Sequence, residues 1–298
     1  MSSHSVYQPR YLPRYERRQI RGLNVNITRW GEPAATPWVF LHGFLDNSAT
    51  FQFLVDAFSE PMAVAAPDWR GFGDSDWAPQ GYWFPDYLAD LDVLLDGISP
   101  NRPAVLVGHS MGGNIATLYA GVRPERVRAV VSLEGFGLPR TSPDEAPVRL
   151  RRWLAEMHST QAFRRYADLA EFAAGLQRRQ PFLSAEQATY MALKLTRPSP
   201  DGGVVFAADP AHRGLNPVLY RREEAQACWR ACTAPVLMML AQNSEFRQSL
   251  GSDAEPEVLQ SIFPNLQVAT IADAGHQLHQ ERATQCAALI AQFLKDWI

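Results

Sequence analysis

The residues from Gly108 to Gly112 read G-H-S-M-G, which places Ser110 between two glycines at the spacing of a nucleophile elbow. A serine in such a turn can attack a carbonyl carbon if a neighbouring base accepts its proton. The pattern alone is weak, because only three of its positions are constrained. The chemistry therefore depends on the flanking elements and on a base, an acid and oxyanion donors elsewhere in the chain.

The segments on both sides of Ser110 have the periodicity that such a turn requires. Residues 103–107 form a short apolar run, which is typical of a parallel strand buried on both faces. After the serine, apolar residues recur at helical steps until Pro124. We therefore expect Ser110 on a tight strand-to-helix turn with an exposed hydroxyl. The alternative is a glycine-rich turn with an incidental serine.

A serine hydroxyl is a poor nucleophile at neutral pH, so a base should come from elsewhere in the chain. His276 is the preferred candidate because it follows Gly275, after the strand-like run 266–271 and before the last apolar helical pattern at 286–297. The competing interpretation is a polar loop histidine in water, and His279 is an equally water-exposed candidate three residues later.

Acyl transfer also needs backbone N–H groups that stabilise an oxyanion. Met111, directly after the serine, should supply one of them. Phe44 should supply the second, because it follows the apolar run 38–41 and because Gly43 lets the backbone turn sharply before it. We expect His42 and His109 to be structural, hydrogen-bonded histidines.

Together with residues 68–75 (D-W-R-G-F-G-D-S), these motifs resemble the α/β-hydrolase fold superfamily, specifically its capped serine hydrolases such as esterases and serine hydrolase-like proteins. They span most of the chain in the family's order. The resemblance implies an α/β fold with a mostly parallel eight-stranded sheet flanked by helices and a helical cap inserted after strand 6. Asp68, Arg70 and Asp74 should brace a loop.

The acid has two possible positions. Most such enzymes carry it after strand 7, here residues 235–241, but the usual spacing falls near Ser244, which cannot serve, with Glu245 adjacent. The second position follows strand 6, here residues 130–133, and is occupied by Glu134. Because the strand end faces the crevice where open α/β sheets build their sites, we favour Glu134. Glu245 is the alternative, and the absence of an acid partner is the remaining case.

Between residues 136 and 216 the strand pattern stops, and three helical patterns take its place. We expect this segment to be a helical cap, or lid, over the carboxyl ends of the strands, with residues 1–135 and 217–298 as the core. Four aromatic side chains should line an apolar substrate pocket that favours uncharged molecules. They are Phe44, Trp69, Phe136 and Trp153.

Composition limits the remaining classes. The 298 residues hold 28 Lys and Arg against 31 Asp and Glu, a net charge of −3, and no basic stripe indicates nucleic acid or an anionic membrane. Apolar runs are far shorter than the roughly 20 residues of a membrane helix. The polar amino terminus does not resemble a signal peptide. We expect a cytoplasmic monomer or homodimer with no metal or other cofactor and, among its three cysteines, no disulfide between Cys228 and Cys232.

Two functions follow. The first is a carboxylesterase-like serine hydrolase acting on small hydrophobic esters, in which Ser110 attacks, His276 transfers the proton and Glu134 orients the imidazole. A thioesterase or a C–C bond hydrolase would use the same residues. The second is a ligand-binding protein of this fold with little turnover. Dehalogenases and epoxide hydrolases of the superfamily are excluded, because they form an ester on an aspartate where this chain has serine.

Overall fold

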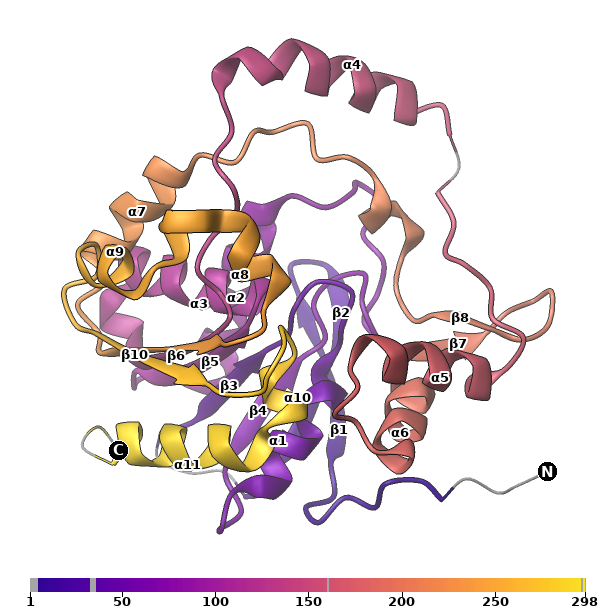
Figure 1. Cartoon of the computed structure of the whole chain (residues 1–298), viewed down its shortest axis with the longest axis horizontal. Coiled ribbons are helices and arrows are strands. Elements are labelled where there is room, and N and C mark those ends of the chain that lie inside the picture. The colour runs from indigo at the N-terminus through magenta and orange to yellow at the C-terminus, as the bar shows by residue number, and fades with distance from the viewer. Residues whose placement is uncertain (1–4, 33–35, 160, 296, 298) are drawn as a thin grey trace.

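The computed structural model describes residues 5–32, 36–159, 161–295 and 297, and Figure 1 shows their arrangement. One eight-stranded sheet runs through the molecule in the order β1-β2-β4-β3-β5-β6-β9-β10. The first two pairings, β1 with β2 and β2 with β4, are antiparallel, and the others are parallel. The strands of the sheet are β1 (Arg14–Ile20), β2 (Leu23–Trp30), β3 (Trp38–Leu41), β4 (Val64–Pro67), β5 (Ala104–His109), β6 (Val127–Leu133), β9 (Val236–Ala241) and β10 (Leu266–Ile271).

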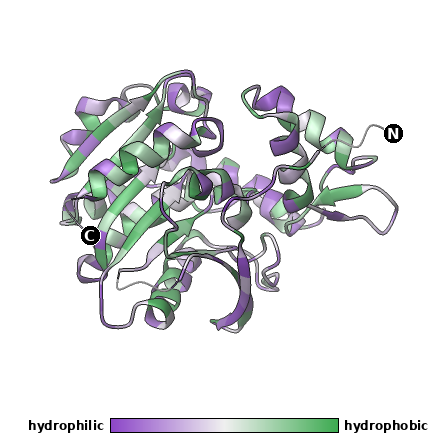
Figure 2. Ribbon diagram, turned by 90° about the horizontal axis from the view of Figure 1, so that it is seen from below, coloured by the Kyte–Doolittle hydropathy of each residue, from purple (hydrophilic) through white to green (hydrophobic). Residues whose placement is uncertain are grey.

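Helices cover both faces of this sheet, so its central strands are apolar along their whole length. Leu106 and Val130 belong to the core under α2, α3, α7 and α9, whereas Val107 and Val131 face α1 and α11. Figure 2 shows the same arrangement as hydrophobic strands enclosed between amphipathic helices. The helices of the core are α1 (Gln52–Ala57), α2 (Phe84–Ile98), α3 (Met111–Val122), α7 (Arg222–Ala231), α8 (Glu245–Leu250), α9 (Pro256–Gln260), α10 (Leu278–Glu281) and α11 (Ala283–Leu294).

A helical insert follows β6, as the sequence predicted. It contains α4 (Ala146–Glu156), α5 (Leu169–Arg179), α6 (Ala185–Leu195) and a hairpin of β7 (Thr196–Pro198) and β8 (Val204–Phe206). Helices α5 and α6 bury Phe172 and Met191 against Phe53 of α1. Helix α4 has no buried residue and stands apart from the sheet (Figure 1). The cap boundaries at residues 136 and 216 remain a prediction.

Short 3-10 helices complete the chain at η1 (Ser48–Phe51), η2 (Pro124–Arg126), η3 (Pro143–Glu145), η4 (Pro210–Arg213) and η5 (Gly251–Ala254). In the described part of the chain, none of the helices combines the length and the apolar character needed to cross a bilayer. The cysteines Cys228, Cys232 and Cys286 all carry free thiols.

Candidate active site

Ser110 lies on the sharp turn between β5 and α3. Its backbone angles, φ 51° and ψ −113°, are rare for a residue with a side chain. The N–H of Ser110 donates a hydrogen bond to the carbonyl oxygen of Leu133 at 2.8 Å, which holds the turn against the end of β6. The structure therefore places the serine at the carboxyl end of the sheet in a strained conformation.

Glycine is required at positions 108 and 112 because other backbone atoms lie very close to them. A Cβ atom at Gly112 would lie 1.9 Å from the carbonyl oxygen of Leu41, and one at Gly108 would lie 2.3 Å from the carbonyl of Gly112. Both distances are far shorter than any non-bonded contact permits. A side chain at either position would push α3 away from the sheet and displace Ser110.

His276 lies within hydrogen-bond distance of the serine. Its Nε2 atom is 2.9 Å from Ser110 Oγ, and its side chain is partly exposed. The loop that carries it, after β10, is held by Glu281, whose Oε2 accepts the N–H of Gly275 at 2.6 Å. Burial raises the pKa of the Glu281 carboxyl. Glu281 was not predicted from the sequence; its only signal is its position five residues after the histidine.

Glu134 lies on the other side of the imidazole. Its Oε2 atom is 3.2 Å from His276 Nδ1, and its Oε1 accepts the N–H of Ala241 at 2.6 Å. The side chain is fully buried, and its backbone has a positive φ of 59°. Since a carboxylate only accepts hydrogen bonds, Nδ1 carries a proton and Nε2 presents its lone pair to the Ser110 hydroxyl.

Glu245, the alternative acid, does not contact the imidazole. It is an exposed residue at the start of α8. Ser244, at the usual acid position after β9, is buried, and its hydroxyl oxygen accepts the N–H of Arg247 at the start of the same helix. The structure therefore brings Glu134, and not Glu245, to His276.

Met111 and the neighbour of Phe44 in the chain, Gly43, lie next to Ser110. Met111 is the first residue of α3, where a helix has an unpaired N–H and a partial positive charge. A Cβ at Gly43 would lie 3.3 Å from Ser110 Cβ, so the loop that precedes Phe44 passes directly over the serine. Among the described residues, the N–H groups of Phe44 and Met111 have no protein acceptor.

Comparison with known proteins assigns the chain to a family. The profile of the alpha/beta hydrolase fold matches residues 36–283, which is most of the chain. The chain belongs to the alpha/beta hydrolase fold family. A serine hydrolase-like protein of Danio rerio is 26% identical over 274 residues, covering 89% of this chain and 83% of that protein.

Two further similarities cover most of this alpha/beta hydrolase. The 2-(acetamidomethylene)succinate hydrolase of Mesorhizobium japonicum is 28% identical over 247 residues, covering 81% of this chain and 82% of the relative. The thioesterase domain from a curacin biosynthetic pathway superimposes with a TM-score of 0.80 at 26% identity, covering 94% of this chain and 99% of that domain.

Besides His276, four histidines in the described part of the chain are buried, and burial lowers the pKa of each: His42, His109, His212 and His279. Burial lowers the pKa of His42 and of His279 to about 3 and holds the pKa of His109 well below its usual value. His42 accepts the N–H of Trp69 at 2.8 Å, and its Nδ1 faces the Gly43 carbonyl at 2.8 Å, which confirms a structural histidine. The expectation that His279 is exposed to water was wrong, because α10 turns it into the interior.

Phe136 and Phe246 form an aromatic pair beside the imidazole. Phe136 is fully buried and stacks on Phe246 at 5.6 Å, and the Phe246 ring lies 5.1 Å from that of His276. Phe246 was missed in the sequence analysis, although it directly follows the alternative acid. Phe44 is half exposed, with its ring edge against Phe72 and His212.

Two expected pocket residues lie elsewhere. Trp69 is buried in the core, where its indole N–H donates to the carbonyl of His42 at 3.1 Å and its ring packs on Tyr87. Trp153 is half-buried on α4, which stands apart from the sheet, so the structure does not bring it to Ser110 (Figure 1). An unassigned cavity of about 420 Å³, lined in part by Glu16, Asp68 and Lys194, does not include Ser110 or His276 in its lining.

The D-W-R-G-F-G-D-S segment braces the loops around the site. Asp68 accepts the N–H of Ser48 at 2.8 Å and the N–H of Asp74 at 3.0 Å. Arg70 forms a bidentate pair with Asp90 at 2.6 and 2.5 Å. These contacts agree with the predicted bracing function of Asp68 and Arg70.

Proposed function

We propose that this alpha/beta hydrolase is a serine hydrolase that cleaves carboxylic esters, or related acyl bonds, of small hydrophobic substrates. The observation that carries the proposal is the continuous connection from Ser110 Oγ through the His276 imidazole to the buried Glu134 carboxylate, at 2.9 and 3.2 Å. This is the arrangement in which a base activates a serine and a third group orients the base.

In the first half-reaction, Ser110 Oγ attacks the ester carbonyl carbon and His276 Nε2 takes the hydroxyl proton. The carbonyl oxygen becomes an oxyanion, which the N–H groups of Phe44 and Met111 stabilise. When the tetrahedral intermediate collapses, His276 returns the proton to the alkoxide leaving group. An alcohol departs, and the acyl group stays on the serine as an ester.

In the second half-reaction, a water molecule attacks the acyl-enzyme, and His276 Nε2 takes one of its protons. Collapse of the second tetrahedral intermediate releases the carboxylic acid and restores the Ser110 hydroxyl. Glu134 stays ionised throughout and stabilises the imidazolium that forms in each half-reaction. The N–H of Ala241 keeps its second oxygen paired, so the carboxylate does not rotate away.

The side chains near the serine favour an uncharged, apolar substrate group. Phe246 lies against His276, and Phe44 presents a half-exposed ring beside the expected oxyanion donors. Esters are the preferred class because an alkoxide demands less of the site than an amine. Thioesters are the second substrate to test, since a thioesterase domain is among the similar structures.

We assign residues 136–216 to a cap on the basis of how the insert returns to the core. Asp209 donates its N–H to the carbonyl of Gly71 at 2.7 Å, and His212 stacks on Phe72 at 3.8 Å. His212 also contacts the Phe44 ring edge to face at 6.1 Å. The returning arm of the cap therefore contacts the loop that carries the proposed oxyanion donor.

The proposal is tested with a fluorophosphonate probe and with short p-nitrophenyl esters and thioesters. Wild type should be labelled once and should turn over the ester, whereas Ser110→Ala should lose both properties and keep its circular dichroism. Ser249→Ala, at an exposed serine on α8, is the matched control and should behave as wild type. If the probe does not label wild type, and if esters raise its Tm without product release, the result would instead indicate a binding protein.

A further inference from the structure

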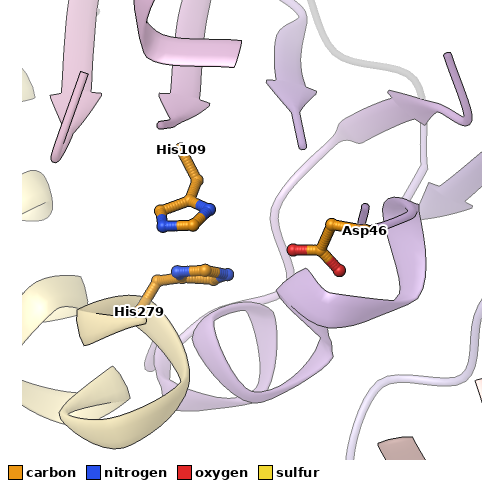
Figure 3. A group of neighbouring side chains, drawn as sticks. All are labelled: Asp46, His109 and His279. Carbon is orange, nitrogen blue, oxygen red and sulfur yellow. The ribbon is translucent and has the colours of Figure 1, made fainter. Parts of the chain in front are cut away.

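Three buried side chains from separate segments meet behind the Ser110 turn. Asp46 comes from the loop after β3, His109 from the end of β5 and His279 from α10; they are 5%, 1% and 0% exposed. One nitrogen or oxygen atom from each lies within 4.8 Å of the others. Figure 3 shows the two imidazole rings one above the other, with the carboxylate beside them.

Each of these side chains has one atom that is bonded and one that is not. Asp46 Oδ1 accepts the N–H of Asn47 at 3.0 Å, and His109 Nε2 is 2.8 Å from the carbonyl oxygen of His276. His279 Nε2 lies 3.4 Å from the Gln280 amide. Within the described residues, Asp46 Oδ2 and the Nδ1 atoms of both histidines have no hydrogen-bond partner.

The hydrogen bonds at the paired atoms determine what the unpaired atoms offer. Because a carbonyl can only accept, His109 Nε2 must donate to it, and Nδ1 therefore carries a lone pair. Asp46 Oδ2 offers a lone pair when the carboxyl is ionised, although burial raises the pKa of this carboxyl well above its ordinary value. The Gln280 amide donates to Gln277 Oε1 at 3.0 Å and faces His279 Nε2 at 3.4 Å, so a metal ion at His279 Nδ1 would take the place of a proton there.

A buried water that donates to Asp46 Oδ2 and His109 Nδ1 and accepts from His279 Nδ1 is the competing occupant, and the metal content of the protein distinguishes it from a cation. A cation would also pair with Asp46 Oδ2, the oxygen of this buried carboxyl that has no hydrogen-bond partner among the described residues. Gly43 packs directly against His109, because a Cβ there would lie 2.8 Å from its Nδ1 atom. Two imidazoles and one carboxylate are a donor set that suits divalent transition metals.

We propose that Asp46, His109 and His279 form a binding site for a divalent transition-metal ion such as Zn²⁺. The bond from His109 Nε2 to the carbonyl of His276 corresponds to the outer hydrogen bonds that orient metal-bound histidines in proteins. The ion would tie the loop after β3, the end of β5 and α10 together. Through His109, which bonds the carbonyl of His276, it would also steady the loop that carries the proposed base.

The test measures metal content and stability, without reference to hydrolysis. The full chain is purified from cultures supplemented with Zn²⁺ or Co²⁺, desalted, and analysed by inductively coupled plasma mass spectrometry. We expect close to one ion per chain, visible d–d absorption for the Co²⁺ form, and a higher Tm than in protein from metal-depleted medium.

Asp46→Asn and His279→Gln should each lose the ion and the Tm increase. His212→Asn is the matched control, because His212 is equally a buried histidine with an unpaired ring nitrogen but lies outside the group. If one variant does not fold, the other decides. Wild type without a bound ion, or variants that retain as much as wild type, would overturn the proposal.

Discussion

Glu134 directly follows β6 with a left-handed backbone, and its carboxylate is fully buried. A buried carboxylate is stable only if both oxygens have partners, and here the partners are the Ala241 N–H and the His276 imidazole. The side chain therefore determines which nitrogen of His276 carries the proton. In the proposed reaction, the lone pair on Nε2 depends on that choice.

Glu134→Gln should keep the shape of this side chain but remove its charge, so the imidazolium of the transition state loses its counterion. We expect kcat for ester hydrolysis to fall on the order of 10⁴-fold. Glu245→Gln changes the exposed glutamate that follows β9, the strand next to β6, and should leave kcat at the wild-type value. Steady-state kinetics on both variants measure this. A larger loss in Glu245→Gln would exclude the assignment of Glu134.

At single residues, the sequence was informative where backbone constraints decide the outcome. The glycines around Ser110 and the position of Glu134 at a strand end indicate local geometry, and the structure brings Ser110, His276 and Glu134 together. It did not indicate that His279 points inward or that Trp153 stands away from the site. Both depend on how α10 and α4 pack, which local patterns do not specify.

At the scale of elements, the apolar face of α4 stands out because it is exposed. Leu150, Leu154 and Met157 are 44%, 57% and 64% exposed, although their spacing is that of a core-facing helix. On α5, by contrast, Phe172 is 1% exposed and packs with Tyr166 and Phe206. Helices α4 and α5 therefore contribute very differently to the free energy of unfolding.

Leu154→Ser should change the free energy of unfolding by less than about 0.5 kcal/mol, because the side chain has little packing to lose. Phe172→Ala should cost about 3–5 kcal/mol, because it leaves a cavity in a buried cluster. Urea unfolding of both variants gives the two values. Equal destabilisation would mean that α4 packs on the body of the molecule in solution.

The parallel strands were predictable because helices cover both faces of the sheet, which makes their sequences rich in apolar residues. The runs at 38–41 and 266–271 coincide with β3 and β10. The helical insert after β6 was predictable because the strand pattern stops there. The short helix α10 was not, since four residues carry too little periodicity to indicate a helix.

At the scale of the whole molecule, buried neutral histidines make stability depend on pH. Burial lowers the pKa of His212 to about 4, against an ordinary value of about 6.5 in the unfolded chain. Below pH 6.5 the unfolded chain binds a proton there and the folded protein does not until about pH 4. The stability contributed by the neutral form is therefore present above pH 6.5 and is lost as the pH falls.

His212→Asn should weaken this dependence. Between pH 7 and pH 5, we expect wild type to lose about 2 kcal/mol more unfolding free energy than the variant. Urea unfolding of both proteins at the two pH values provides the comparison. His158→Asn, at an exposed histidine, should follow wild type. Identical losses in wild type and His212→Asn would show that His212 is protonated in the folded state.

The central claim is that an acyl group is carried by Ser110, and the most direct measurement is intact-protein mass spectrometry after rapid acid quenching of a p-nitrophenyl ester reaction. Wild type should gain the mass of one acyl group during turnover, which digestion of the quenched protein should locate on the peptide that contains Ser110, and Ser110→Ala should gain none. Turnover without an acylated species, or acylation at another residue that persists in Ser110→Ala, would contradict the account.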